Sequence, residues 1–111
     1  MAMKVERGEI WWINLDPAVG REIKKRRPCV VISANEINRF RSTPVIIPLS
    51  SSPESAPPII LPIPSAGKDS VAVIDQIRAV DKSRFVNRSG AVSTQDLRAI
   101  EQAVKQVLHL P

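Results

Sequence analysis

The stretch Gly20–Ser33 reads GREIKKRRPCVVIS and joins dense positive charge directly to an apolar, β-prone run. Five of the seven residues from Arg21 to Arg27 are basic, and such a charge run lies on a protein surface because like charges repel one another. The ring of Pro28 disfavours helical backbone at Arg27, so Arg27 should be extended. We therefore expect a cationic loop that enters a buried strand at Arg27, where the guanidinium can bind a phosphate through two hydrogen bonds.

Composition limits the classes of function. A chain of 111 residues with a net charge of +5 suggests one domain, 1–111, that meets a polyanion. One histidine and one cysteine cannot build a zinc site, and we expect neither a metal nor another cofactor. Without a long apolar run or a signal-peptide pattern, we expect a cytoplasmic protein with no membrane contact. Cys29 lies within an apolar run, so we expect a small buried side chain rather than a nucleophile.

Most of the chain predicts strands. Residues 9–15 are aromatic and β-branched, and residues 29–32 and 45–47 form short apolar runs typical of buried strands. Pro44 and Pro48 flank residues 45–47, which favours an edge strand or a bulge there. We also expect a short edge strand at 59–61 within a Pro- and Ser-rich loop. Residues 70–80 predict one long strand, or two strands that meet at a bulge.

One helix is predicted near the C-terminus. Ser93 or Thr94 can cap it, and Asp96 in its first turn matches the helix dipole. An apolar face with helical spacing follows, made of Leu97, Ile100, Val104, Val107 and Leu108. This face should pack against the sheet, so we expect a mainly β fold: a small, mostly antiparallel barrel or half-barrel with one terminal helix.

An ordered set of short blocks spans nearly the whole chain. The blocks are Arg7-Gly8-Glu9-Ile10-Trp11, Leu15-Asp16-Pro17, Gly20-Arg21-Glu22, Arg27-Pro28-Cys29-Val30-Val31-Ile32, Asn38-Arg39-Phe40, Ile47-Pro48-Leu49-Ser50-Ser51 and Asp75-Gln76-Ile77-Arg78-Ala79-Val80-Asp81-Lys82. In order and spacing they resemble the MazF/PemK family of toxin endoribonucleases.

The resemblance implies an SH3-like, partly open antiparallel barrel with a C-terminal helix, working as a homodimer in the cytoplasm. It implies a toxin of a type II toxin–antitoxin system, an mRNA interferase. Such an enzyme cuts single-stranded RNA at short motifs without a metal and leaves 2′,3′-cyclic phosphate and 5′-hydroxyl ends. An acidic antitoxin would silence it by covering the same groove.

The resemblance also assigns the catalytic pair. Arg27 would stabilise the pentacoordinate phosphorane, and the hydroxyl of Ser50 would donate a further hydrogen bond. The family usually has threonine at the position of Ser50. A second arrangement, found in some PemK-type members, is absent because Arg21 and Val73 occupy the places of its histidine and arginine. Glu22 can act as the general base, or it can organise Arg27 or Lys24 through a salt bridge.

Several further side chains are expected to bind RNA. Arg21, Lys24, Lys25 and Arg26 would contact phosphates, Ser51 and Ser52 would read bases, and Gln76 and Arg78 are weaker candidates. The alternation of a strand allows one of Trp11 and Trp12 to face outward, although both could also lie in the core or a dimer interface. Two other functions stay open: a toxin of the same fold that acts on a topoisomerase, as in the CcdB group, and an RNA-binding barrel without catalysis.

Overall fold

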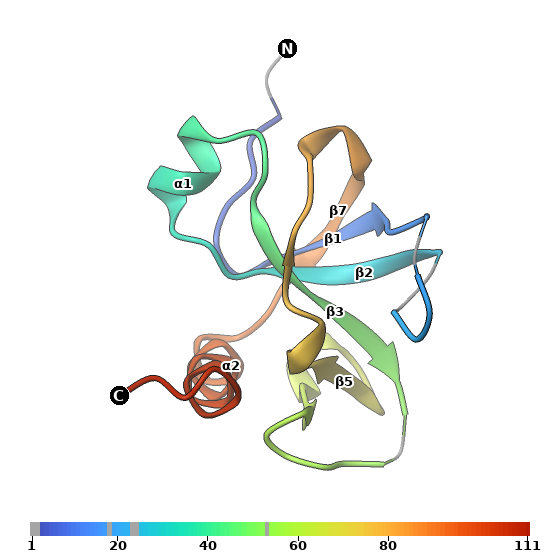
Figure 1. Cartoon of the computed structure of the whole chain (residues 1–111), viewed down its shortest axis with the longest axis vertical. Coiled ribbons are helices and arrows are strands. Elements are labelled where there is room, and N and C mark those ends of the chain that lie inside the picture. The colour runs from blue at the N-terminus through green and yellow to red at the C-terminus, as the bar shows by residue number, and fades with distance from the viewer. Residues whose placement is uncertain (1–2, 18, 23–24, 53) are drawn as a thin grey trace.

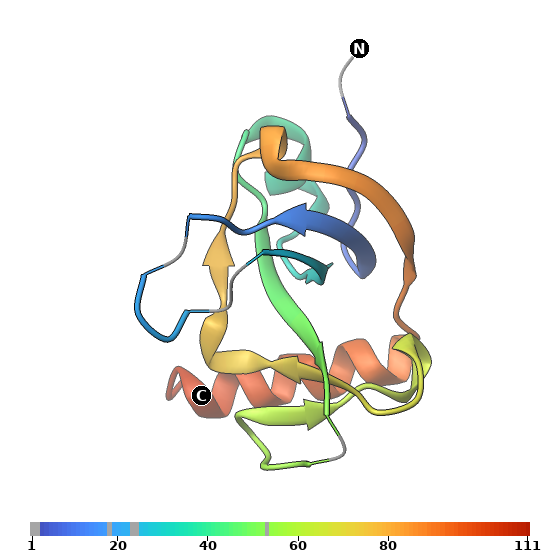
Figure 2. The same ribbon diagram turned by 90° about the vertical axis from the view of Figure 1, so that its right-hand side faces the viewer.

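The computed structural model describes residues 3–17, 19–22, 25–52 and 54–111. Its elements follow one another as β1 (Glu9–Asn14), β2 (Arg26–Val31), α1 (Asn35–Phe40), β3 (Val45–Ser51), β4 (Ile60–Pro62), η1 (Pro64–Ala66), β5 (Ser70–Val73), η2 (Ile74–Gln76), β6 (Arg78–Ala79), η3 (Lys82–Arg84), β7 (Phe85–Ala91) and α2 (Thr94–Val107). Helices α1 and α2 lie at opposite ends of the molecule (Figures 1 and 2). Within the described ranges, no helix is long and apolar enough to cross a membrane.

The strands form one antiparallel sheet that does not close. Their order is β4-β5-β3-β2-β1-β7, and β6 pairs with β3 beside this path. The predicted mainly β, partly open barrel with a C-terminal helix is therefore confirmed. The short strand expected at 59–61 is present as β4 and lies at one edge of the sheet. The predicted break in 70–80 is also present, but a 3-10 turn, η2, separates β5 from β6.

Strand β3 is central, so one of the two alternatives predicted for the run between the prolines, an edge strand, is wrong. On one side β3 pairs with β2 through Ile46, Ile47 and Pro48. On its other side it pairs with β6 up to Ile46 and then with β5 from Leu49 onward. Pro48 thus occupies the point where β3 passes from β6 to β5. A residue without a backbone N–H is tolerated there because no ladder donor is needed in that gap.

Two apolar clusters cover the two faces of the central strands. One cluster contains Trp11, Cys29 and Val31, and the other contains Val30, Ile47 and Ile100. Alternate residues of β2 therefore enter different clusters, which confirms the prediction that this strand is buried on both faces. Cys29 is fully buried, as expected for a small apolar side chain.

The predicted terminal helix is α2, and its ends match the sequence signals. The Ser93 hydroxyl accepts a hydrogen bond from the backbone N–H of Asp96 at 3.0 Å. The Asp96 carboxylate in turn accepts one from the backbone N–H of Ser65 at 2.8 Å, which ties the helix start to η1. Ile100 and Ala103 are buried against the sheet, whereas Leu108 at the helix end is exposed. In Figure 2, α2 runs along the side of the molecule that carries β5.

Besides the short 3-10 turns, one α-helix and one strand escaped the sequence analysis. Helix α1 has only six residues and no side-chain N-cap, so no helical period is visible. A buried polar contact holds it instead: the side-chain amide of Asn38 donates to the Ser33 carbonyl at 3.0 Å. Strand β7 exposes most of its side chains, and its pairing with β1 is what makes it a strand. Its buried residue Phe85 meets Trp11 edge to face, with ring centroids 5.6 Å apart.

The packing of α2 makes a stability prediction. Replacing Ile100 by Ala should lower the free energy of unfolding by about 2–5 kcal/mol, because the fully buried side chain leaves a cavity between α2 and the sheet. The exposed Gln102 on the same helix is the matched control, and its change to Ala should cost less than about 0.5 kcal/mol. Urea denaturation followed by circular dichroism measures both. Equal midpoints for the two variants would contradict this packing.

Candidate active site

The candidate active site begins where β2 and β3 separate. Their last paired residues on this side are Cys29 and Pro48. Continuing the antiparallel register by two residues brings Arg27, near the start of β2, opposite Ser50, near the end of β3. Residues two apart on a strand share a face, so these side chains lie on the side of the sheet occupied by Cys29. The two predicted catalytic residues, 23 positions apart in the sequence, therefore both lie at one opening in the sheet.

An open hollow of about 400 Å³ lies at this separation. We call it the Arg27 hollow; its lining residues are Trp12, Arg26, Arg27, Pro28, Leu49, Ser50, Ser51, Ala66, Lys68 and Ser70. It contains the predicted catalytic pair together with two of the predicted RNA-binding residues, Arg26 and Ser51. Four neighbouring segments of the chain thus contribute to a single concave surface.

The tryptophan pair of β1 divides between core and surface. Trp11 is buried, whereas 37% of Trp12 is exposed and its side chain lines the Arg27 hollow. Trp12 lies opposite Pro28 in the β1–β2 ladder, which places the indole at the entrance to the strand that carries Arg27. The aromatic surface at the hollow is therefore Trp12.

The Arg27 hollow is strongly cationic. Arg26, Arg27 and Lys68 line it, and among the described residues no carboxylate does so. One of these charges, that of Arg27, also acts on the nearby thiol of Cys29. Burial raises the pKa of that thiol to about 12, while the positive charges of Arg78 and Arg27 act to lower it. Arg78, a weaker candidate from the sequence, therefore lies close enough to share a buried neighbour with Arg27.

The predicted residues of the β1–β2 loop lie outside the hollow. Arg21, Glu22 and Lys25 are exposed, and none of them lines it. The Glu22 carboxylate accepts a hydrogen bond from the backbone N–H of Val19 at 2.6 Å, so in this arrangement it organises its own loop. Lys24, a predicted phosphate contact, lies outside the described residues.

The remaining candidates lie next to the hollow or away from it. Ser52 lines two adjoining depressions rather than the Arg27 hollow itself. Gln76 lies in η2 and Arg78 in β6, and neither lines the hollow. The sequence analysis missed Lys68 and Ser70, which do line it. A lone lysine in a loop carries no pattern; only the pairing of β5 with β3 brings this segment to the end of β3.

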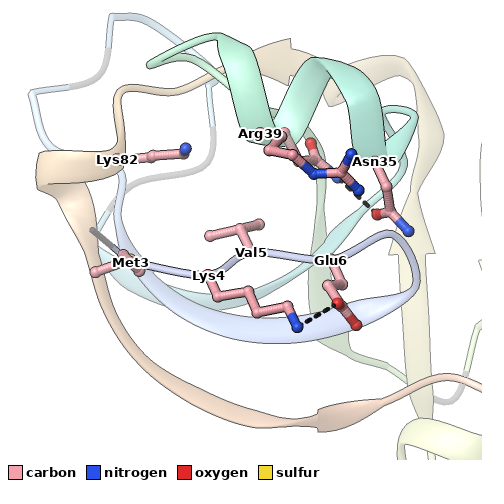
Figure 3. A pocket seen from close by; sticks show the side chains of 8 residues that line it. Met3, Lys4, Val5, Glu6, Asn35, Arg39 and Lys82 are labelled. Atoms are coloured by element: carbon pink, nitrogen blue, oxygen red, sulfur yellow. Dashed lines mark hydrogen bonds and ion pairs between the residues drawn. The ribbon is translucent and has the colours of Figure 1, made fainter. Parts of the chain in front are cut away.

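A second pocket, of about 310 Å³, lies between the N-terminal segment, α1 and η3 (Figure 3). Lys4, Arg39 and Lys82 surround it, and Lys4 forms an ion pair with Glu6 at 3.3 Å. It lies near the first residues of β3, whereas the Arg27 hollow lies at the last ones. Of the sequence block 38–40, Asn38 is buried in the contact with Ser33 and Phe40 is 80% exposed.

Metal ligands do not cluster in the described part of the chain. No three side chains of His, Cys, Asp and Glu type come together there as a group that could hold an ion.

Comparisons with known proteins agree with this architecture. The family described as "PemK-like, MazF-like toxin of type II toxin-antitoxin system" matches residues 6–108. Endoribonuclease MazF9 of Mycobacterium tuberculosis is 33% identical, covering 96% of this chain and 96% of that protein. Endoribonuclease EndoA of Bacillus subtilis is 28% identical, covering 97% of each.

Solved structures of similar proteins share the fold. A MazF crystal structure from Deinococcus radiodurans matches with a TM-score of 0.84 at 23% identity, covering 98% of this chain and 100% of that one. A mycobacterial structure described as an endoribonuclease in complex with its cognate antitoxin matches with a TM-score of 0.78 at 20% identity, covering 96% and 97%.

The burial of Cys29 makes a chemical prediction. Its thiol should resist a disulfide reagent such as DTNB at pH 8 in the native protein, because it is enclosed and its raised pKa keeps it protonated. In guanidinium chloride the same thiol should react fully. A Cys29→Ser, Ser89→Cys variant, with its thiol on exposed β7, is the control and should react in both conditions. Rapid reaction of native Cys29 would contradict the described packing.

Proposed function

The chain belongs to the PemK-like, MazF-like toxin family of type II toxin–antitoxin systems, and we propose that it cuts single-stranded RNA at short sequence motifs without a metal. The products would carry 2′,3′-cyclic phosphate and 5′-hydroxyl ends. The full-length relatives named endoribonucleases support the plain class, a toxin endoribonuclease. One observation supports the finer proposal: Arg27 and Ser50 both line a cationic hollow where β2 and β3 separate.

The chemistry needs little from the protein beyond positioned charge and hydrogen-bond donors. The ribose 2′-oxygen attacks the adjacent phosphorus, and the bond from phosphorus to the 5′-oxygen breaks. The proton of the 2′-hydroxyl is removed, and the 5′-oxygen gains one. The guanidinium of Arg27 would bind the equatorial oxygens of the phosphorane, with the Ser50 hydroxyl donating a further hydrogen bond. Removing one such donor typically slows a reaction by about 10²–10³-fold.

Glu22 has two possible roles in this scheme. Its hydrogen bond from Val19 supports the role of organising the β1–β2 loop. The role of general base requires its carboxylate to leave Val19 and enter the Arg27 hollow, a movement open to an exposed loop side chain when RNA binds.

RNA binding would combine charge with stacking. Arg26 and Lys68 line the hollow, and the exposed Arg21 and Lys25 extend positive charge along the β1–β2 loop. Contacts from these cations to phosphates make affinity fall with salt. The half-exposed indole of Trp12 offers a face for one base, and a stacked base contributes about 1–3 kcal/mol.

An antitoxin would bind the same cationic surface. A structural neighbour is described as an endoribonuclease bound to its cognate antitoxin. We propose that an acidic antitoxin covers the Arg27 hollow here, because that hollow presents three cations.

The exposed Phe40 on α1 supports assembly as a homodimer, since a large apolar side chain in water favours a partner surface. The site of action would be the cytoplasm, where mRNA is translated.

The two other functions considered from the sequence have less support. A topoisomerase toxin of the CcdB type would not need an arginine and a hydroxyl residue lining one hollow. An RNA-binding barrel without catalysis shares every binding feature, and only a cleavage assay separates it from a nuclease.

The test is incubation of the purified protein with a long unstructured RNA in EDTA, followed by mapping of the cut ends. We expect discrete cuts that carry cyclic-phosphate ends. Replacing Arg27 by Ala should slow them about 10³-fold, because the phosphorane loses its charged partner. Arg98→Ala is the matched control, since this exposed arginine of α2 lies outside the hollow and its loss should leave the rate unchanged.

Intact RNA with a folded wild-type protein would overturn the proposal and leave the binding barrel. Cleavage that only added Mg²⁺ restores would overturn the metal-free scheme. Cleavage equal in the wild type and in Arg27→Ala would remove the assigned site.

A further inference from the structure

The Arg27 hollow continues into a second depression. This neighbour has a volume of about 250 Å³, and the two share Lys68 and Ser70 as lining residues. We call it the Glu54 hollow; its lining residues are Ser52, Glu54, Ser55, Pro62, Pro64, Gly67, Lys68, Asp69, Ser70 and Val71. A linear ligand that fills the first hollow can therefore extend into the second past Lys68.

Lys68 is held at this boundary by a constrained turn. The residues on both sides of it have positive φ, 127° at Gly67 and 59° at Asp69. For aspartate this conformation is uncommon and persists where surrounding contacts hold it. The Asp69 carbonyl accepts a hydrogen bond of 2.7 Å from the backbone N–H of Ser52, just beyond β3. The turn is thus tied to the strand that carries Ser50, which fixes Lys68 relative to the candidate active site.

The two hollows differ in charge. Cations line the Arg27 hollow, whereas the Glu54 hollow contains two carboxylates, Glu54 and Asp69, beside Lys68. Within the described residues, neither carboxylate accepts a hydrogen bond or forms an ion pair. Carboxylates repel a phosphate but accept hydrogen bonds from amino groups, as in the contact of Glu or Asp with the amino group of cytosine. The second hollow therefore suits a base better than a phosphate.

We propose that the Glu54 hollow binds the nucleobase next to the cleaved linkage and selects one that carries an exocyclic amino group, C, A or G, over U, which has none. Glu54 and Asp69 would accept hydrogen bonds from its Watson–Crick edge, and Lys68 would bind the phosphate that joins the nucleotides in the two hollows. This inference rests on the proposed RNA cleavage and adds to it a reason for sequence preference.

The test uses an RNA pool with randomised positions and sequencing of the cut ends. The wild type should disfavour U at one position beside the cut. In the variant Glu54→Gln with Asp69→Asn, the ratio of cuts beside C, A or G to cuts beside U should fall about tenfold or more. The reason is that an amide can also donate a hydrogen bond to the carbonyl oxygens of U. Asn tolerates positive φ, so the change at position 69 leaves the turn intact. Glu36→Gln, on α1 outside both hollows, is the control and should keep the wild-type preference.

Lys68 is tested by binding to a 2′-O-methylated RNA pool that cannot be cut. Lys68→Met should weaken binding of all sequences alike and reduce the slope of log affinity against log salt by about 0.7, the value of one phosphate contact on a single strand. Lys68→Arg keeps the charge and should restore both.

The outcomes separate this inference from the proposed function. Cleavage by the wild type with an unchanged base preference in the Glu54→Gln, Asp69→Asn variant would overturn the inference alone, as would a preference for U. Absence of any cleavage would overturn the proposed function. If no cleavage occurs, the binding assay still tests the phosphate contact of Lys68. An unchanged salt slope in Lys68→Met would overturn that contact.

Discussion

The change of partner along β3 is the constraint on which the rest of the structure depends. This strand pairs with β2 and β6 in its first half and with β5 in its second, and Pro48 lies at the exchange. The pairing of β2 with β3 starts only at Cys29. The residues of β2 before Cys29 are therefore open on the β3 side, although they still pair with β1. Backbone hydrogen bonds fix both strands up to this point. The side chains at the opening are therefore held by regular structure, and such a site is more precise than one on loops alone.

Positive charge gathers at the opening between β2 and β3. Arg27 lies on the face of Cys29, and burial keeps that thiol protonated although two arginines favour its ionised form. Because the thiol stays neutral, it adds no negative charge beside Arg27 and Arg78. The residues that line the hollow include Trp12 as well as the cations, so a phosphate and a base can both be bound there. The Glu54 hollow contains carboxylates. A bound RNA strand would therefore pass from a positively charged hollow into one that carries negative charge.

Elements with their own local signals were predictable from the sequence. Helix α2 has a capping serine and an apolar face, and β1 and β2 are rich in β-branched and aromatic residues. Elements that depend on distant partners were not: α1 is held by the buried Asn38, and β7 exists through its pairing with β1. The candidate site divides in the same way. The block around Arg27 and the residue Ser50 carry a family pattern, whereas Lys68 reaches the hollow only because β5 pairs with the end of β3.

A double-mutant cycle on Arg27 and Ser50 tests the central claim most directly. Single-turnover cleavage rates would be measured for the wild type, Arg27→Ala, Ser50→Ala and the double variant, with Arg27→Ala combined with Ser89→Ala as the control pair. If both side chains act on one phosphorane across the opening, the double variant should be within about tenfold of the slower single variant. Losses that simply multiply would show that the two residues act independently, which would contradict a shared site at the opening between β2 and β3.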